Sequence, residues 1–176
     1  FIDGNLITQS NVNTWQSKIS HVPQTIFIND SSIASNIAFG VLENEIDLER
    51  VKHVAEVAQI HDTIIMLDHG YNTVVGEMGS KLSGGQRQRI AIARALYRKF
   101  DVLVFDEATS ALDTKTEKDL MNAINALTPK PTIVMIAHRI STLDNCDVIY
   151  ELNKGKILRY GDYNKMSSSN ADKDFD

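Results

Sequence analysis

The sequence has little of several features that define other protein classes. Its single cysteine, Cys146, excludes an internal disulfide and fits a reducing compartment. No apolar run approaches the ~20 residues that span a bilayer, so we expect any membrane association to come through a partner or a missing segment. The net charge of -5 argues against general nucleic-acid binding, which favours basic faces. The 176 residues, of which 43% are hydrophobic and 23% charged, suit one globular domain.

Apolar stretches separated by helical patterns predict an α/β fold. Strands are expected at residues 19–23, 102–105 and 132–137. The last two are continuous apolar runs, as expected of strands buried on both faces of a sheet. Near the ends of the chain, Asp3-Gly4 predicts a turn between short strands. Asn153-Lys154-Gly155 predicts a hairpin of residues 148–152 and 156–160.

Helical periodicity fills the sequence between these strands. Residues 31–67 carry apolar side chains at helical spacing, with Asp47 as a plausible N-cap for the segment that follows it. Another helix is expected to begin at Ser83. Residues 113–127 predict a helix that buries Leu120, Ile124 and Leu127. Residues 167–176 are serine-rich and acidic, which predicts a disordered tail.

The most informative run is Leu82-Ser83-Gly84-Gly85-Gln86. A helix N-terminus has unpaired N–H groups and about half a positive charge. Because Gly84 and Gly85 lack side chains, a phosphate can approach their amides closely, and the Ser83 hydroxyl can add a donor. An ordinary capped helix start is the alternative for so short a motif. A nearby excess of cations suits a polyphosphate or, alternatively, a solvated helix face; it consists of Lys81, Arg87, Arg89, Arg94, Arg98 and Lys99.

Polar side chains follow the ends of three expected strands, where open α/β sheets place their ligands. Asp106 suits a Mg²⁺ ion that neutralises phosphate charge, and Glu107 suits the group that orients or activates water. His138 is expected at the same edge, where a neutral imidazole can hydrogen-bond a γ-phosphate or hold a water. Gln24, just after Pro23, can ligate Mg²⁺ through its amide oxygen. A solvated acidic strand end and a structural histidine are the alternatives.

These motifs together resemble the nucleotide-binding domain of ATP-binding cassette (ABC) transporters. Residues 82–86 match the LSGGQ signature, and residues 102–107 match the Walker B strand with its catalytic glutamate. Further matches cover the D-loop, Q-loop and switch histidine, at Ser110-Ala111-Leu112-Asp113, Val22-Pro23-Gln24 and His138. Two segments resemble the exporter branch, at residues 35–40 and 73–79. The resemblance implies a P-loop NTPase-like ABC ATPase core with a helical signature subdomain.

One element of that family is missing from the sequence. No G-x-x-x-x-G-K-[ST] motif occurs, although the glycines Gly79 and Gly84 have its spacing. The family places this Walker A P-loop, with its strand and helix, upstream of the segment that resembles Phe1-Ile2-Asp3-Gly4. We therefore expect a chain truncated before Gly4, whose remaining strands lose ladder partners and helix cover. We also expect this fragment alone to be inactive.

The resemblance assigns the site residues to two different ATP molecules. In the family, two domains sandwich two nucleotides head to tail. Ser83, Gly84, Gly85 and Gln86 would act on the partner's ATP, and Asp113 would lie at the dimer interface. The residues facing the chain's own ATP and Mg²⁺ would be Gln24, Asp106, Glu107 and His138, with Gln24 and Asp106 as metal ligands. Glu107 and His138 would be catalytic.

The same resemblance implies the partners, the location and the domain limits. A second nucleotide-binding domain and a transmembrane domain are the expected partners, with no nucleic acid, at the cytoplasmic face of the cell membrane. Residues 1–166 would form the partial domain, with its helical subdomain at about residues 31–85, followed by the tail. Two alternatives stay open: a non-catalytic, partner-dependent interaction module, and a soluble DNA-repair or chromosome-type ABC ATPase. The latter carry long coiled coils, whereas this sequence has no heptad run.

Overall fold

The computed structural model describes residues 1–137 and 139–168, and the chain divides into two compact units, Phe1–Val134 and Met135–Asp176. Two strands of the first unit, β1 (Ile19–Val22) and β2 (Val102–Asp106), pair in parallel. Its helices are α1 (Val12–Gln16), α2 (Ile33–Ile37), α3 (Leu48–Val57), α4 (His61–Ile65), α5 (Gly84–Tyr97) and α6 (Thr114–Asn125). None of the described helices is long and apolar enough to cross a bilayer.

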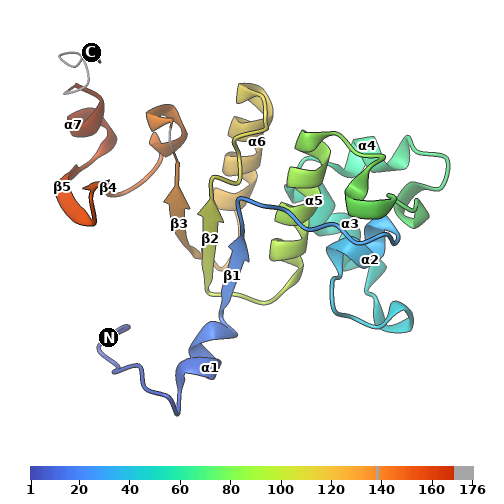
Figure 1. The fold of residues 1–176 in the computed structure, drawn as a ribbon, viewed down its shortest axis with the longest axis horizontal. Coiled ribbons are helices and arrows are strands. Elements are labelled where there is room, and N and C mark those ends of the chain that lie inside the picture. Colours follow the sequence, from blue (N-terminus) through green and yellow to red (C-terminus); the bar gives the residue numbers. More distant parts are fainter. Residues whose placement is uncertain (138, 169–176) are drawn as a thin grey trace. The chain divides into compact units, whose positions relative to one another are not determined.

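The sheet has the strand order β1-β2-β3, where β3 spans Thr132–Ile136 and begins in the first unit (Figure 1). Parallel pairing of β1 with β2 requires a crossover connection, and the helices between them supply it. The expectation that the later strands are buried on both faces is wrong. In β2 only Leu103 and Phe105 are fully buried. In β3 the Val134 and Ile136 side chains are 46% and 52% exposed.

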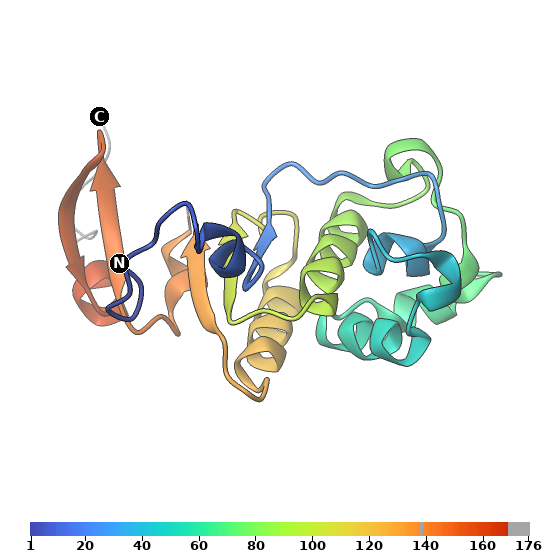
Figure 2. The same cartoon turned by 90° about the horizontal axis from the view of Figure 1, so that it is seen from below.

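Helix α5 lies between the sheet and the cluster of α2, α3 and α4 (Figures 1 and 2). Its apolar side chains, among them Ile90 and Ile92, are buried at this double interface. The buried Ser20 hydroxyl of β1 donates to the Ala95 carbonyl oxygen at 2.7 Å, which ties the strand to the helix. Asp47 caps α3 as expected, accepting the Arg50 N–H at 3.0 Å. The predicted helical stretch of residues 31–67 is broken into three α-helices and a 3₁₀ turn at Glu43–Glu45.

Arg94 of α5 joins that helix to α2 and to the segment that leads out of β1. Its guanidinium donates to the carbonyl oxygens of Phe27 at 2.7 Å and of Asn36 at 2.8 Å, and to Asn36 Oδ1 at 3.1 Å. The guanidinium also lies 4.9 Å from the centre of the Phe39 ring. Asn36 is fully buried and bonds both the N–H and the carbonyl oxygen of Asn29 at 3.0 Å. This network holds three segments together.

In the second unit, β4 (Ile149–Asn153) and β5 (Lys156–Gly161) form the predicted antiparallel hairpin. Lys154 and Gly155 have φ of 48° and 74°, as a two-residue turn with the right twist requires. The rings of Tyr150 and Tyr160 stack across the strands, with centroids 5.7 Å apart. A helix follows that the sequence did not predict, α7 (Tyr163–Ser168), and it includes the first two residues of the predicted tail. The other tail residues, 169–176, lie outside the described residues.

The N-terminal segment contains the predicted turn but not the strands around it. Asp3 and Gly4 have φ of 47° and 77°. Ile2 and Asn5 exchange two backbone hydrogen bonds of 2.9 Å, which make an isolated bridge rather than a pair of strands. The short helix α1 was also not predicted, since no apolar periodicity marks it and none of its residues is buried.

Candidate functional site

The start of α5 is closed by a reciprocal capping box. Ser83 is the N-cap, and its Oγ accepts the Gln86 N–H at 3.2 Å, while the Ser83 N–H donates to Gln86 Oε1 at 2.8 Å. The predicted helix start at Ser83 is therefore confirmed. Capping satisfies two of the free N–H groups of this terminus. The Ser83 Oγ is an acceptor in this box, so its hydroxyl hydrogen can still be donated to a ligand.

The two glycines of the motif pack against another part of the chain. A methyl group added at Gly85 would lie 3.2 Å from the Ala111 carbonyl oxygen and 3.8 Å from Leu112 Cδ2. One added at Gly84 would lie 4.0 Å from the Ala111 Cβ. The lack of a side chain at Gly85 therefore lets the helix start approach the segment that precedes α6. This close packing within the chain was not part of the sequence prediction.

Glu107 occupies a strained turn directly after β2. Its φ is 50°, in the left-handed region that residues other than glycine seldom adopt. The Gln24 side chain, which follows β1, donates its amide N–H to Glu107 Oε2 at 2.8 Å. Two residues that are 83 positions apart in the sequence thus meet at the ends of neighbouring strands, as the parallel sheet predicts. Asp106, the last residue of β2, lies beside them in the chain and is half-buried.

Sequence analysis did not single out Gln88, which links the two halves of this site. Its side chain is 4% exposed. Gln88 Oε1 accepts the Ala111 N–H at 2.9 Å, and Gln88 Nε2 donates to the Glu107 carbonyl oxygen at 3.4 Å. One buried amide on α5 therefore positions both the turn at Glu107 and the segment before α6. A buried polar residue on an otherwise apolar helix face was the signal that could have revealed it.

Asp113 is the N-cap of α6. Its carboxylate accepts the Thr116 N–H at 3.0 Å and the Thr116 hydroxyl at 2.6 Å. These hydrogen bonds lower the pKa of Asp113 below its ordinary value, and the bond from the Thr116 hydroxyl has the largest effect. The carboxylate stays exposed to solvent, so it can also contact another chain.

Most of the cations near this helix start have backbone acceptors within the chain, so their role toward a polyphosphate stays a prediction. Arg87, Arg89 and Arg94 all donate to backbone carbonyl oxygens. The acceptors are those of Leu82 at 2.8 Å, of Gln59 at 2.6 Å and of Asn36 at 2.8 Å, respectively. Lys81 donates to the Val74 carbonyl oxygen at 3.0 Å. Arg98 and Lys99 follow the C-terminal end of α5, about 20 Å from Ser83 at 1.5 Å of rise per residue. The hydrogen bonds of Lys81, Arg87, Arg89 and Arg94 to carbonyl oxygens join segments of the helix cluster and so stabilise it.

The donor set after β1 and β2 fits a magnesium ion that is shared with phosphate oxygens. Mg²⁺ is usually bound through one or two protein oxygens together with substrate phosphates and water. Since Gln24 uses its amide nitrogen on Glu107, its amide oxygen is left for a ligand, and the Asp106 carboxylate is the second candidate. Residues 1–137 and 139–168 contain no group of three or more His, Cys, Asp or Glu that could hold a metal without such phosphates. His138 lies outside the described residues.

Comparison with known proteins gives one consistent family. The family model described as "ABC transporter" matches residues 1–110. The chain is 43% identical over 166 residues to ABC multidrug transporter mdr1 of Aspergillus fumigatus, covering 94% of this chain and 12% of that protein. It is 45% identical over 166 residues to the ATP-dependent lipid A-core flippase of Saccharophagus degradans, covering 94% and 28%. The solved structure of a bacterial Atm1-family ABC exporter with ATP bound aligns with a TM-score of 0.81 at 36% identity, covering 93% of this chain and 30% of that one. The chain thus spans less than a third of the length of each of these relatives.

Proposed function

We propose that this chain, which belongs to the ABC transporter family as an exporter-type nucleotide-binding domain, serves in the intact protein to bind and hydrolyse ATP and so to drive transmembrane export. Intact members of the family are ATPases, and its fold is the P-loop NTPase-like ABC core. The observation that carries the proposal for this chain is the hydrogen bond from Gln24 to Glu107 at the ends of β1 and β2.

The proposed chemistry is in-line attack of water on the γ-phosphate of ATP. Glu107 is the general base that accepts a proton from the water, and the Gln24 amide orients its carboxylate. Asp106 and Gln24 would hold Mg²⁺, which would neutralise phosphate charge when bound with ATP. The left-handed turn at Glu107 and the hydrogen bond from Gln88 to its carbonyl oxygen fix the backbone from which the carboxylate projects. His138 keeps the role that the family resemblance implies, as the histidine that contacts the γ-phosphate.

The α5 start has a different proposed ligand, the ATP held by a second nucleotide-binding domain. The capping box keeps Ser83 and Gln86 in place, and the helix N-terminus offers the amides of Gly84 and Gly85 to a phosphate. The exposed Asp113 lies at the interface with that second domain. Closure of the pair excludes water from the nucleotide and aligns it for attack.

The partners and the location of the whole protein are also proposed. A transmembrane domain completes the exporter, as it does in relatives named multidrug transporters and flippases. The nucleotide-binding domain would then lie at the cytoplasmic face of the membrane. Within it, the segment around Phe27 to Ser32 would lie near the membrane domain. Because the sequence has no G-x-x-x-x-G-K-[ST] motif, we propose that the 176 residues alone turn over no ATP.

Replacing Glu107 by glutamine tests the proposal in the transporter subunit that carries this chain together with a P-loop. Glu107→Gln should abolish phosphate release while ATP binding persists, because glutamine keeps the shape of the side chain but cannot accept the proton. Glu45→Gln, a change at an exposed residue of a 3₁₀ turn, is the matched control and should hydrolyse ATP like the unmodified subunit. Undiminished turnover in Glu107→Gln would contradict the assignment. Mg²⁺-dependent phosphate release by the purified 176-residue chain would contradict the proposed inactivity.

A further inference from the structure

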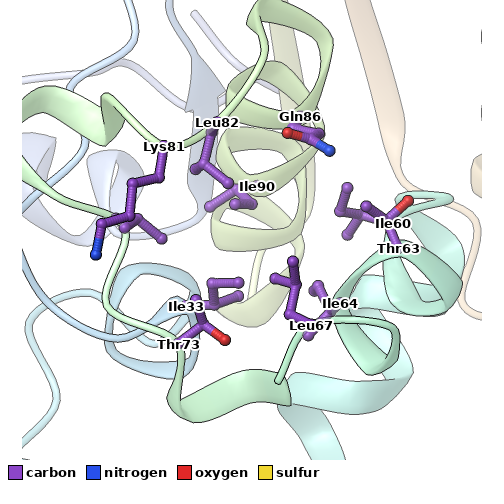
Figure 3. Close-up of a pocket in the computed structure, with 11 residues that line it drawn as sticks. Ile33, Ile60, Thr63, Ile64, Leu67, Thr73, Lys81, Leu82, Gln86 and Ile90 are labelled. Atoms are coloured by element: carbon purple, nitrogen blue, oxygen red, sulfur yellow. The ribbon is translucent and has the colours of Figure 1, made fainter. Parts of the chain in front are cut away.

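A cavity of about 180 Å³ lies within the helix cluster of the first unit (Figure 3). It is bounded by α4, by the first two turns of α5, by the start of α2 and by the segment that connects α4 to α5. Most of its wall is aliphatic. The lining residues are Ile33, Ile60, Thr63, Ile64, Leu67, Thr73, Val75, Lys81, Leu82, Gln86 and Ile90.

The size of the cavity limits the ligand it can hold. An engineered apolar cavity of about 150 Å³ stays dry and binds benzene, so about 180 Å³ accommodates a ring of that size with one substituent. The Lys81 ammonium does not enter, because it donates to the Val74 carbonyl oxygen at 3.0 Å and is turned away from the other lining side chains (Figure 3). The wall therefore presents the alkyl chain of Lys81, and no charged group favours an ionic ligand.

One polar atom in the wall lacks a partner. Thr73 Oγ1 is buried and has no hydrogen-bond partner among the residues that the structure describes. In Figure 3 this hydroxyl is turned toward the Leu67 side of the cavity. A buried hydroxyl without a partner is costly, and a ligand that offers it a hydrogen bond removes that cost. The wall is thus mostly aliphatic, and among its described residues Thr73 Oγ1 is the one fully buried side-chain nitrogen or oxygen without a hydrogen-bond partner.

We propose that this cavity binds a small neutral aromatic molecule with one hydroxyl group, of the size of a phenol, whose hydroxyl pairs with Thr73. The apolar ring replaces empty space next to Ile60, Ile64 and Ile90, and the hydroxyl satisfies Thr73 Oγ1. This binding would be independent of ATP hydrolysis.

The position of the cavity gives the ligand an effect on the start of α5. Leu82 and Gln86 line it, and Gln86 is half of the capping box that fixes Ser83. A ligand that binds only the folded, capped arrangement stabilises that arrangement by mass action. The occupied cavity should therefore reduce fluctuation of residues 82–86.

Binding of 4-fluorophenol to the 176-residue chain, followed by ¹⁹F NMR, tests the proposal. We expect saturable binding with a dissociation constant of about 1 mM or tighter, and binding about ten-fold weaker for fluorobenzene because it cannot pair with Thr73. Amide exchange at residues 82–86 should slow in the presence of saturating 4-fluorophenol. Binding that does not saturate, or equal affinity for the two probes, would overturn the proposal.

Two variants separate the cavity from other sites of contact. Leu67→Trp fills the cavity and should abolish binding, whereas Met66→Trp adds the same ring at a neighbouring residue that is 83% exposed and should bind like the unmodified chain. Thr73→Val keeps the shape of the side chain and should lose the preference for 4-fluorophenol over fluorobenzene. If Leu67→Trp does not fold, Thr73→Val still decides the question. Unchanged binding in Leu67→Trp, or an unchanged preference in Thr73→Val, would refute this site.

Discussion

Replacing Arg94 by methionine removes the polar link between α5, α2 and the segment after β1. The guanidinium makes three hydrogen bonds, to the Phe27 carbonyl oxygen, the Asn36 carbonyl oxygen and Asn36 Oδ1. Methionine keeps most of the apolar stem, but it has no donor and loses the guanidinium that lies over the Phe39 ring. The experiment therefore measures the hydrogen bonds more than the packing.

The expected loss follows from the surroundings of each acceptor. A hydrogen bond to a charged donor contributes about 1.5–3 kcal/mol, and a buried acceptor left without a partner costs about 1–3 kcal/mol. The Asn36 residue is fully buried, whereas Phe27 is 56% exposed, so water can replace the guanidinium only at the Phe27 carbonyl oxygen. Asn36 Oδ1 keeps the Asn29 N–H. Relief of the burial that lowers the pKa of Arg94 offsets part of the loss. We expect a net destabilisation of about 3 kcal/mol.

Equilibrium unfolding in urea, followed by far-ultraviolet circular dichroism, measures this loss as a shift of the midpoint at constant slope. Arg94→Lys keeps the charge but reaches fewer acceptors, so it should lose about half as much. Arg98→Met is the matched control at an exposed position after the same helix, and it should stay within about 0.5 kcal/mol of the unmodified chain. If Arg94→Met lost no more stability than Arg98→Met, the network would not stabilise the helix cluster.

Three further predictions concern the same unit. Ser83→Ala should cost about 1 kcal/mol in urea unfolding because it removes the capping box, whereas Ser83→Asp should retain most of the stability; equal losses would contradict the role of the cap. Gly79→Ala should destabilise more than Gly40→Ala, since both have positive φ but only at Gly79 would the new methyl group meet a neighbour, Ile28 Cγ2 at 3.1 Å; equal costs would show that packing is irrelevant there. Burial raises the pKa of Tyr71 from 10.0 to about 12, with a smaller contribution from the nearby Glu56 carboxylate. The contribution of the neutral phenol to the stability of the fold is therefore fully present below pH 10.0 and is lost as the pH rises toward 12. The absorbance titration of the unmodified chain minus that of Tyr71→Phe should show one phenol with a pKa of about 12, and a midpoint near 10 would refute the assignment.

Features that depend on neighbouring residues could be predicted from the sequence. The caps at Asp47 and Ser83 and the turn at Lys154-Gly155 are examples, because each is decided within a few residues. The meeting of Gln24 with Glu107 could also be predicted, since the carboxyl ends of parallel strands share an edge. The ATP and magnesium roles of these residues stay predictions.

Features that depend on distant partners could not be predicted. Gln88 contacts residues 19 and 23 positions away, and no local pattern indicates which loop a helix face will meet. The acceptors of the cations near the signature could not be predicted for the same reason, because Arg89 and Arg94 reach carbonyl groups 30 to 67 residues away. Composition shows that charge is abundant, whereas the fold decides which acceptor each charge finds. The exposure of Val134 and Ile136 in β3 likewise depends on what packs on that face of the sheet rather than on their being apolar.

The bonds of Gln88 have a consequence for timing within a pair of such domains. The start of α5 would serve the ATP of one site, whereas the turn at Glu107 would serve the ATP of the other. Gln88 and the close packing of Gly85 on Ala111 join these two parts of one chain. A tilt of α5 at the first site would therefore be transmitted to the carboxylate at the second without a change in the intervening sheet. Hydrolysis at the two sites would then be mechanically coupled through the buried Gln88 amide and the contact between Gly85 and Ala111.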